Sequence, residues 1–209
     1  MILSYGIENI DRVAYLLFQH IGLFGFSLGL AVITGLVLGS IVASPALERY
    51  SSSVLSFSAA TQAIPPVAVI ALAFLFAGIG AVPVILALYL YSIVPILFNT
   101  VSGLTSVPDS VIQAGRGMGF TQLQILGKVR MPLAAPIIMA GIRSAATINI
   151  GAATIASIIG GGGLGDLIFM GLKLYRIDMI FAGAVLCALL ALTVDGALAL
   201  LQRSFHKYA

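Results

Sequence analysis

Charged residues are scarce in this 209-residue sequence. Asp, Glu, Lys and Arg together make up 8% of it, whereas a soluble domain carries about 25%. With 60% hydrophobic residues and a mean hydropathy of +1.14, this scarcity excludes a soluble protein and indicates an integral membrane protein. The net charge of +3 is too small and too scattered to indicate binding of nucleic acid.

Residues that carry chemistry are also few. The single cysteine, Cys187, excludes a disulfide within the chain and a cysteine cluster for a metal. The two histidines, His20 and His206, flank predicted spans and are interpreted as interface residues. The glycine run at 160–163 is not a phosphate loop, because Gly-Lys-Ser/Thr does not follow it. The sequence therefore indicates neither an enzyme nor a cofactor or metal in this chain. If the protein does work that needs energy, a partner must supply that energy.

Long apolar runs predict an all-α integral membrane protein. A spanning helix needs about 20 mostly apolar residues. Five stretches meet that need: 21–43, 54–77, 81–104, 133–159 and 179–201. Residues 1–18 hold Glu8, Asp11 and Arg12 among apolar residues at helical spacing, so this stretch is predicted to be an amphipathic elbow helix at the interface and not a cleavable signal peptide.

The first span contains two Gly-x-x-x-Gly spacings. Gly25 and Gly29 form one of them, and Gly35 and Gly39 form the other. Such spacings let a neighbouring helix approach closely, although glycine is also tolerated in membrane helices without that role.

Residues 106–131 interrupt the apolar sequence with two short amphipathic helices. Pro108 and Asp109 are typical of a helix start, where the missing proline N–H costs nothing and a carboxylate favours the helix dipole. The predicted apolar face of the first helix comprises Val111, Ile112, Ala114 and Met118. Gly119 is expected to end this helix with a positive φ.

A second short helix is predicted after Gly119. Thr121 and Gln124 have the spacing of a capping box, which indicates a helix start. Met131 and Pro132 are expected to end it, because a residue before proline is biased away from helical geometry.

This segment resembles the cytoplasmic signature of the inner-membrane subunits of ATP-binding-cassette importers. That signature is Glu-Ala-Ala, three residues, Gly, nine residues, then Ile-x-Leu-Pro. The same spacing occurs here in Gln113-Ala114-Gly115, Gly119 and Val129-Arg130-Met131-Pro132, with four side chains that differ: Gln113, Gly115, Val129 and Met131. The resemblance implies a coupling helix that docks on an ATPase. The residues that it assigns to coupling are Pro108, Asp109, Val111, Ile112, Gln113, Ala114, Gly115, Arg116, Met118 and Gly119.

Three further stretches, 62–72, 90–100 and 132–168, resemble the permeases that import osmoprotectants such as glycine betaine, carnitine and choline. The resemblance implies the type I importer permease fold, with about five spans, an external elbow helix and a cytoplasmic coupling helix. It also implies a translocation path for a quaternary ammonium compound, with ATP and magnesium bound by the partner. A permease for methionine or another small solute, or a non-conducting scaffold that recruits an ATPase, are the alternatives.

The same resemblance implies the partners and the membrane. They are two ATPase subunits, a second permease copy or a paralogue, and an external substrate-binding protein, in the lipid bilayer of a bacterial inner membrane. Placing residues 106–131 in the cytoplasm puts six cations inside (Arg49, Arg116, Lys128, Arg130, Arg203 and Lys207) and three outside (Arg12, Lys173 and Arg176). This distribution obeys the positive-inside rule and predicts an external amino terminus and a cytoplasmic carboxyl terminus.

Polar residues within the spans are candidates for the translocation path. Gln62, Pro65 and Pro66 mark either a bend beside the path or a packing kink. Asn99 and Asn149 either line a cavity or form hydrogen bonds between helices, and the cavity is favoured for Asn149.

Two ionisable residues lie inside predicted spans, Arg143 and Asp195. Counted from the nearest span ends, their depths differ by only about 5 Å. One hypothesis is that they pair, within the chain or across a subunit boundary; the alternative, which is favoured, is that each reaches an interface or a water-filled cavity alone.

Overall fold

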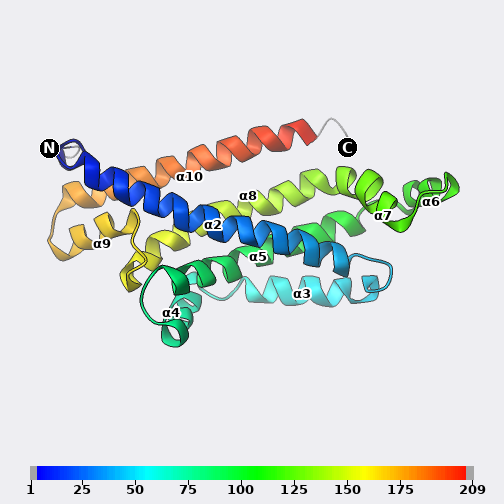
Figure 1. The fold of residues 1–209 in the computed structure, drawn as a ribbon, viewed down its shortest axis with the longest axis horizontal. Coiled ribbons are helices and arrows are strands. Elements are labelled where there is room, and N and C mark those ends of the chain that lie inside the picture. The colour runs from blue at the N-terminus through cyan, green and yellow to red at the C-terminus, as the bar shows by residue number, and fades with distance from the viewer. Residues whose placement is uncertain (1–3, 206–209) are drawn as a thin grey trace. The chain divides into compact units, whose positions relative to one another are not determined.

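The computed structural model of this chain describes residues 4–205, and all regular structure in that range is helical (Figure 1). The α-helices are α1 (Ser4–Glu8), α2 (Ile10–Val42), α3 (Ser51–Thr61), α4 (Pro66–Ala77), α5 (Ala81–Thr105), α6 (Asp109–Gly117), α7 (Gln122–Ile125), α8 (Met131–Ala156), α9 (Gly165–Lys173) and α10 (Ile177–Phe205). Short 3-10 turns at Glu48–Tyr50 (η1) and Ser157–Ile159 (η3), and a π-helical turn at Leu126–Arg130 (η2), complete the chain's regular elements in this range.

Four helical stretches between residues 4 and 205 are long and apolar enough to cross a membrane. They are Ile10–Val42, Ala81–Thr105, Gln122–Ile159 and Ile177–Ser204. Helices α3 and α4 form an interrupted pair, which makes a fifth span if the two are counted as one. The all-α fold with about five spans is therefore confirmed.

The first span begins earlier than predicted. Residues 19 and 20 are helical and not a break, because α2 runs unbroken from Ile10 to Val42; the break in the helical chain lies earlier, at Asn9 between α1 and α2. Neither proline nor glycine occurs between positions 10 and 21 to stop a helix. Asp11 also lies in the first turn of α2, where a carboxylate favours the helix dipole. The amphipathic start and the span are thus one helix.

The predicted span 54–77 is interrupted between Thr61 and Pro66. Pro65 has extended geometry (φ −61°, ψ 138°) and Pro66 is the first residue of α4. Two successive prolines lack N–H donors, and each disfavours helical geometry in the residue before it. The α3 helix therefore cannot continue through this point.

Met131 and Pro132 do not end a helix, contrary to the prediction. The helical chain continues from Gln122 to Ile159 through the π-helical turn η2. At the end of that turn the Met131 N–H donates to the Leu126 carbonyl, five residues back. Because this shifts the hydrogen-bond register just before Pro132, the proline falls in a first turn of α8, where its missing N–H is tolerated.

The described chain forms two compact units. Unit 1 comprises residues up to 31, 64–92 and 145–195, and unit 2 comprises residues 32–63, 93–144 and from 196 onward. The helices α2, α5, α8 and α10 each contribute residues to both units.

In unit 1, an apolar cluster joins α2, α4, α5 and α8 through Leu23, Ile70, Leu88 and Ala153. A second cluster joins α9 to the start of α10, which lies beside it in Figure 1, through Leu167 and Met179. These two clusters form the unit's core.

The glycine-rich loop before α9 is also part of unit 1 and is held by α2. The Gly163 N–H donates to Gln19 Oε1 at 3.0 Å, and the Leu164 N–H donates to His20 Nδ1 at 3.3 Å. His20 is buried, so its interpretation as an interface residue is wrong. His206 lies outside the described residues.

In unit 2, glycines let helices approach closely. A methyl group on Gly35 would lie 2.7 Å from Ile96 Cγ2, and one on Gly39 would lie 2.6 Å from Thr100 Cβ, so α2 packs on α5 through these two glycines. A methyl group on Gly141 of α8 would likewise lie 2.8 Å from the Pro95 carbonyl oxygen of α5. The second Gly-x-x-x-Gly spacing is therefore a close-packing site.

Candidate coupling site

Helix α6 begins as its sequence predicts, but the residue that it buries is Gly115 and not the predicted apolar face, of which only Ile112 is half-buried. Pro108 is the extended N-cap residue, and Asp109 lies in the first turn. Gly115 is buried, and a methyl group there would lie 3.7 Å from both Phe120 and Ile125, an ordinary contact distance. The alanine of the importer signature would fit at this position, so the departure at Gly115 leaves the packing intact.

The side of α6 opposite Gly115 and the turns after the helix are open to solvent. Among the residues predicted to couple, the exposed ones are Pro108, Asp109, Val111, Gln113, Ala114, Arg116, Met118 and Gly119, and Ile112 is half-buried. Met118 is 67% exposed and Leu123, in α7, is 80% exposed. Large apolar side chains in the open at a polar end of the molecule are typical of a docking surface.

The break between α6 and α7 has the predicted geometry. Gly119 has a φ of +83°, in the left-handed region that favours glycine. The Gln124 N–H donates to Thr121 Oγ1 at 3.3 Å, and the Thr121 N–H donates to Gln124 Oε1 at 2.9 Å. These reciprocal bonds form the capping box that starts α7.

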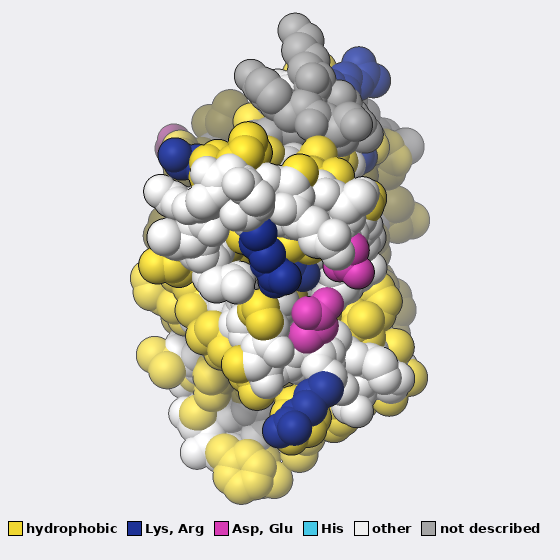
Figure 2. Space-filling view, turned by 90° about the vertical axis from the view of Figure 1, so that its right-hand side faces the viewer, with side chains coloured by type: hydrophobic (Ala, Val, Ile, Leu, Met, Phe, Trp, Pro, Cys, Tyr) yellow, Lys and Arg dark blue, Asp and Glu magenta, His cyan; other side chains and the backbone are white. Residues whose placement is uncertain are grey.

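A polar hollow of about 190 Å³ lies between α6, α7 and the connector at 44–50. It is lined by Pro45, Glu48, Asp109, Ile112, Gln113, Arg116, Gln122, Ile125 and Arg130. Figure 2 looks onto the end where α6 lies and shows acidic and basic side chains gathered there among apolar ones. Both charge signs are therefore available to a partner at this site.

Arg130 also lines this hollow and is only 7% exposed. Its Nε and Nη2 donate to the Leu104 carbonyl at 3.0 and 2.8 Å, and its Nη1 donates to the Ala43 carbonyl at 2.9 Å. Sequence reasoning counted Arg130 only as a cytoplasmic charge. A cation directly before a long apolar run was the available signal, but its two acceptors are 26 and 87 residues away.

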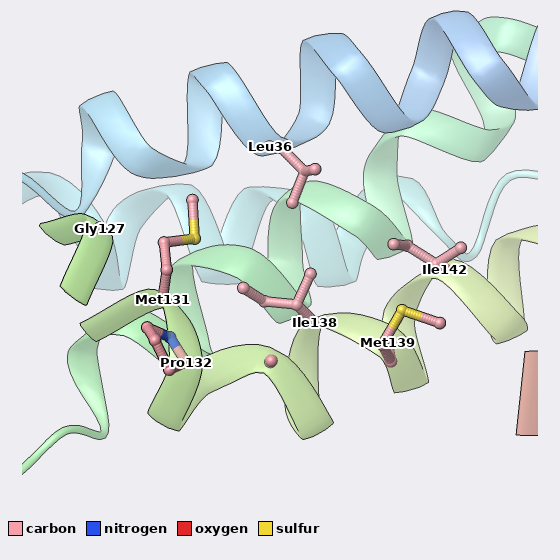
Figure 3. Close-up of a pocket in the computed structure, with 8 residues that line it drawn as sticks. Leu36, Gly127, Met131, Pro132, Ile138, Met139 and Ile142 are labelled. Atoms are coloured by element: carbon pink, nitrogen blue, oxygen red, sulfur yellow. The ribbon is translucent and has the colours of Figure 1, made fainter. Parts of the chain in front are cut away.

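A larger cavity in unit 2, of about 510 Å³, was not predicted. Its lining residues are Leu36, Gly127, Met131, Pro132, Ala135, Ile138, Met139 and Ile142. Figure 3 shows Leu36 of α2 pointing toward Ile138 of α8. Because none of the lining side chains is polar, the cavity offers nothing to recognise a charged solute.

The predicted path residues have different surroundings. Gln62 and Pro65 are exposed at the interruption between α3 and α4, where Pro66 starts the second helix. Asn99 is half-buried, and its Nδ2 donates to the Pro95 carbonyl at 2.8 Å in its own helix. The interruption itself is confirmed, and its place beside a path stays a prediction.

Asn149 is 1% exposed and belongs to a buried polar network in unit 1. Its Nδ2 donates to Ser27 Oγ at 3.0 Å and to Ser92 Oγ at 2.7 Å, which connects α8 with α2 and α5. These contacts favour the interhelical alternative over a cavity-lining role.

The two intramembrane charges lie in different units. In unit 2, Arg143 Nη1 donates to Gln202 Oε1 at 2.8 Å, and Gln202 Nε2 donates to the Pro136 carbonyl at 2.9 Å. Asp195 lies on α10 in unit 1. The pairing of Arg143 with Asp195 stays a prediction.

A second hollow, of about 240 Å³, lies beside α9 in unit 1. Asp166 and Lys173 line it with Phe169 and Met170. Burial raises the pKa of the Asp166 carboxyl, and the positive charge of Arg12 partly opposes this rise. Within residues 4–205 no three His, Cys, Asp or Glu side chains converge as a metal site requires.

Comparison with known proteins identifies the family. Residues 35–207 match the family described as "Binding-protein-dependent transport system inner membrane component". The chain belongs to this family. The permease is thus a membrane-spanning transport subunit of an ATP-driven importer and not an enzyme, and such subunits act with an ATPase and a substrate-binding protein.

Several relatives match the permease over nearly its whole length. The choline transport system permease protein OpuBB of Bacillus subtilis is 38% identical over 93% of this chain and 89% of its own. The carnitine transport permease protein OpuCB of Listeria monocytogenes is 41% identical, over 96% and 91%. The osmoprotectant import permease protein OsmW of Salmonella typhimurium is 39% identical, over 96% and 94%.

Solved structures show that the permease has the type I importer fold. The inward-facing MetNI methionine transporter matches with a TM-score of 0.82 and 21% identity, over 94% of this chain and 97% of the other. An amino acid transporter solved with histidines matches with a TM-score of 0.75 and 17% identity, over 97% and 98%. At these identities the likeness concerns the fold.

Proposed function

We propose that this permease forms the translocation path for a quaternary ammonium osmoprotectant such as glycine betaine, carnitine or choline. The observation that carries the proposal is the near full-length match, at 38% to 41% identity, with permeases named for choline, carnitine and osmoprotectants. The stretches that resemble osmoprotectant permeases in sequence cover parts of α4 and α5, nearly all of α8, and the chain from there to the start of α9.

The exposed side of α6 is the proposed docking surface for the ATPase. Val111 and Met118 offer apolar contact, while Gln113 and Arg116 offer hydrogen bonds on the same accessible helix. ATP and magnesium would be bound by the ATPase subunits, whose closure would carry α6 with them. The spans would then swing between inward-facing and outward-facing arrangements as rigid bodies.

The proposed assembly contains two permease subunits, either two copies of this chain or this chain with a paralogue. Five passes offer half of a pathway, so a second permease completes it. Two ATPase subunits bind on the cytoplasmic side, and an external protein delivers the substrate. The positive-inside rule supports an external amino terminus and a cytoplasmic carboxyl terminus in the bacterial inner membrane, with Lys207 outside the described residues.

The interruption between α3 and α4 is the proposed border of the path. Gln62, Pro65 and Pro66 lie at it, and its free backbone groups would be satisfied by water along the path. Asn99, half-buried on α5, is proposed to line the same path.

Uptake tests this function. Cells with and without this gene, which express the ATPase and binding-protein genes beside it, receive labelled glycine betaine, carnitine, choline and methionine at low and high osmolarity. We expect gene-dependent uptake of at least one quaternary ammonium compound. Uptake of methionine alone would refute an osmoprotectant as the substrate. No uptake despite insertion and a bound ATPase would favour the scaffold alternative.

The coupling assignment has its own test, Gly119→Pro. Proline fixes φ near −65°, which is incompatible with the +83° at this position. We expect loss of uptake and of ATPase stimulation while the protein still inserts. The control is Gly117→Ala, since Gly117 lies in α6 and a methyl group there meets no described atom within 4 Å. Normal uptake by Gly119→Pro would refute the assignment.

A further inference from the structure

The two ends of the coupling segment, defined here as residues 106–125 with α6 and α7, lie close together within unit 2. Leu104 lies in the last turn of α5, just before the segment, and Arg130 ends the π-helical turn that follows it. These residues are 26 positions apart, yet two guanidinium nitrogens of Arg130 hold the single carbonyl of Leu104. The Arg130 side chain therefore holds together the two ends of the loop that carries α6 and α7.

The same guanidinium also reaches the end of another helix. Its Nη1 donates to the carbonyl of Ala43, one residue beyond the end of α2. Carbonyls at helix carboxyl ends lack partners within the helix and lie at the negative end of its dipole, so a cation is favourable there. Arg130 thus caps α2 and α5 together and directly precedes α8.

The hydrogen bonds from Arg130 to the Ala43 and Leu104 carbonyls, here called the Arg130 clamp, lie in surroundings that make them strong and specific. Ala43 and Leu104 belong to an apolar cluster with Ala134 and Ile138 of α8. Charge-assisted hydrogen bonds are stronger in such surroundings, because little water competes for the donors. The fork of a guanidinium presents fixed donors to both carbonyls, whereas a lysine ammonium is a single point on a flexible stem.

We propose that Arg130 is a positioning residue that makes the coupling segment, the ends of α2 and α5, and the start of α8 move as one body. This proposal rests on the proposed function, in which an ATPase moves α6. Without the clamp, α6 would swing on its connectors when the ATPase closes. ATP would then be hydrolysed without moving the spans.

The first test measures glycine betaine transported per ATP hydrolysed by the complete importer in proteoliposomes. We expect Arg130→Gln to lower this ratio about tenfold, as expected for losing a charge-assisted hydrogen bond, while the ATPase still copurifies. Arg130→Lys should be intermediate. The matched control is Arg49→Gln, because Arg49 is exposed and its guanidinium lies over the Tyr50 ring. A wild-type ratio in either Arg130 variant would overturn the proposal.

The second test keeps Arg130 and therefore does not depend on whether an Arg130 variant folds. Spin labels are attached at the exposed positions 110 in α6 and 140 in α8, after Ser110→Cys and Ala140→Cys, with the native thiol removed by Cys187→Ala. With Arg130 intact, we expect the distance between the two labels to be the same without nucleotide and with ATP trapped. A resolved change between these states would overturn the proposal.

The two tests separate the failure of the clamp from the failure of the proposed function. If the wild type transports none of the three labelled quaternary ammonium compounds, the proposed function fails. The label distances still decide the clamp, since they need only a bound ATPase and ATP.

Discussion

Two alanine substitutions in α2 are expected to differ in their effect on stability. A methyl group on Gly39 would lie 2.6 Å from both Cβ and Cγ2 of Thr100 in α5, whereas one on Gly25 would meet no described atom within 4 Å. Both glycines lie inside a helix, where alanine is favoured over glycine by about 0.8–1.0 kcal/mol. Gly25→Ala should therefore stabilise the permease.

For Gly39→Ala, a steric cost opposes this gain in stability. Carbon atoms in contact lie about 3.5–4.0 Å apart, so the two helices must separate by about 1 Å. Overpacking of this kind costs about 1–3 kcal/mol, and this cost is the expected difference between the two variants. For a chain of this size, about 2–4 °C of melting temperature corresponds to each kcal/mol, so the variants should differ by about 2–12 °C.

The assay is the loss of the monodisperse peak in size-exclusion chromatography after heating in detergent. A fluorescent protein fusion reports the peak, because the chain has no tryptophan. The melting temperature of Gly35→Ala should resemble that of Gly39→Ala, since its methyl group would lie 2.7 Å from Ile96. The melting temperature of Gly29→Ala should resemble that of Gly25→Ala. If Gly39→Ala melted at or above Gly25→Ala, the close-packing argument would be refuted.

Three further predictions concern polar groups. Asn149→Leu should lower the melting temperature by only about 2–5 °C, because it removes two interhelical hydrogen bonds, each worth about 0.6 kcal/mol in a membrane. Uptake should persist. Lost uptake at an unchanged melting temperature would instead place Asn149 on the path. Burial raises the pKa of Asp166 above its unfolded value, against the opposing charge of Arg12, so its stabilising contribution is present at low pH and lost as pH rises through the folded pKa. Melting curves of the wild type should show this fall and those of Asp166→Asn should not; parallel pH profiles would contradict the assignment. For Arg143→Gln and Asp195→Asn, the double variant should assemble better than the single variants predict together, and no such rescue would remove support for the pair.

Local signals in the sequence predicted local structure well. The positive φ of Gly119 and the capping box of Thr121 and Gln124 were both predictable, because the atoms that determine them lie within a few residues. The same holds for the start of α6 at Pro108. The close packing at Gly39 was foreseen as one alternative, since spacing alone does not say which helix lies opposite.

Long-range contacts were beyond such reasoning. Arg130 was predicted only as a charge, because the carbonyls that it binds lie at positions 43 and 104 and a backbone carbonyl has no sequence signature. Asn149 was assigned to a cavity for the same reason, since its serine partners are 57 and 122 residues away. At Pro132 the local rule failed, because a π-helical turn moved the hydrogen-bond register ahead of the proline.

That π-helical turn constrains which insertions and deletions this gene can tolerate. A π-turn contains one residue more than an α-helix needs, and each residue of an α-helix advances the helix by about 100°. Deleting one residue from Leu126–Arg130 would remove that extra residue and leave ordinary helix whose two ends keep their phase, whereas the same deletion early in α8 would rotate everything before it by about 100° relative to the rest of α8. Only the deletion in α8 would turn the exposed side of α6 in another direction, so homologues that differ by one residue in length should differ within the π-turn and not within α8.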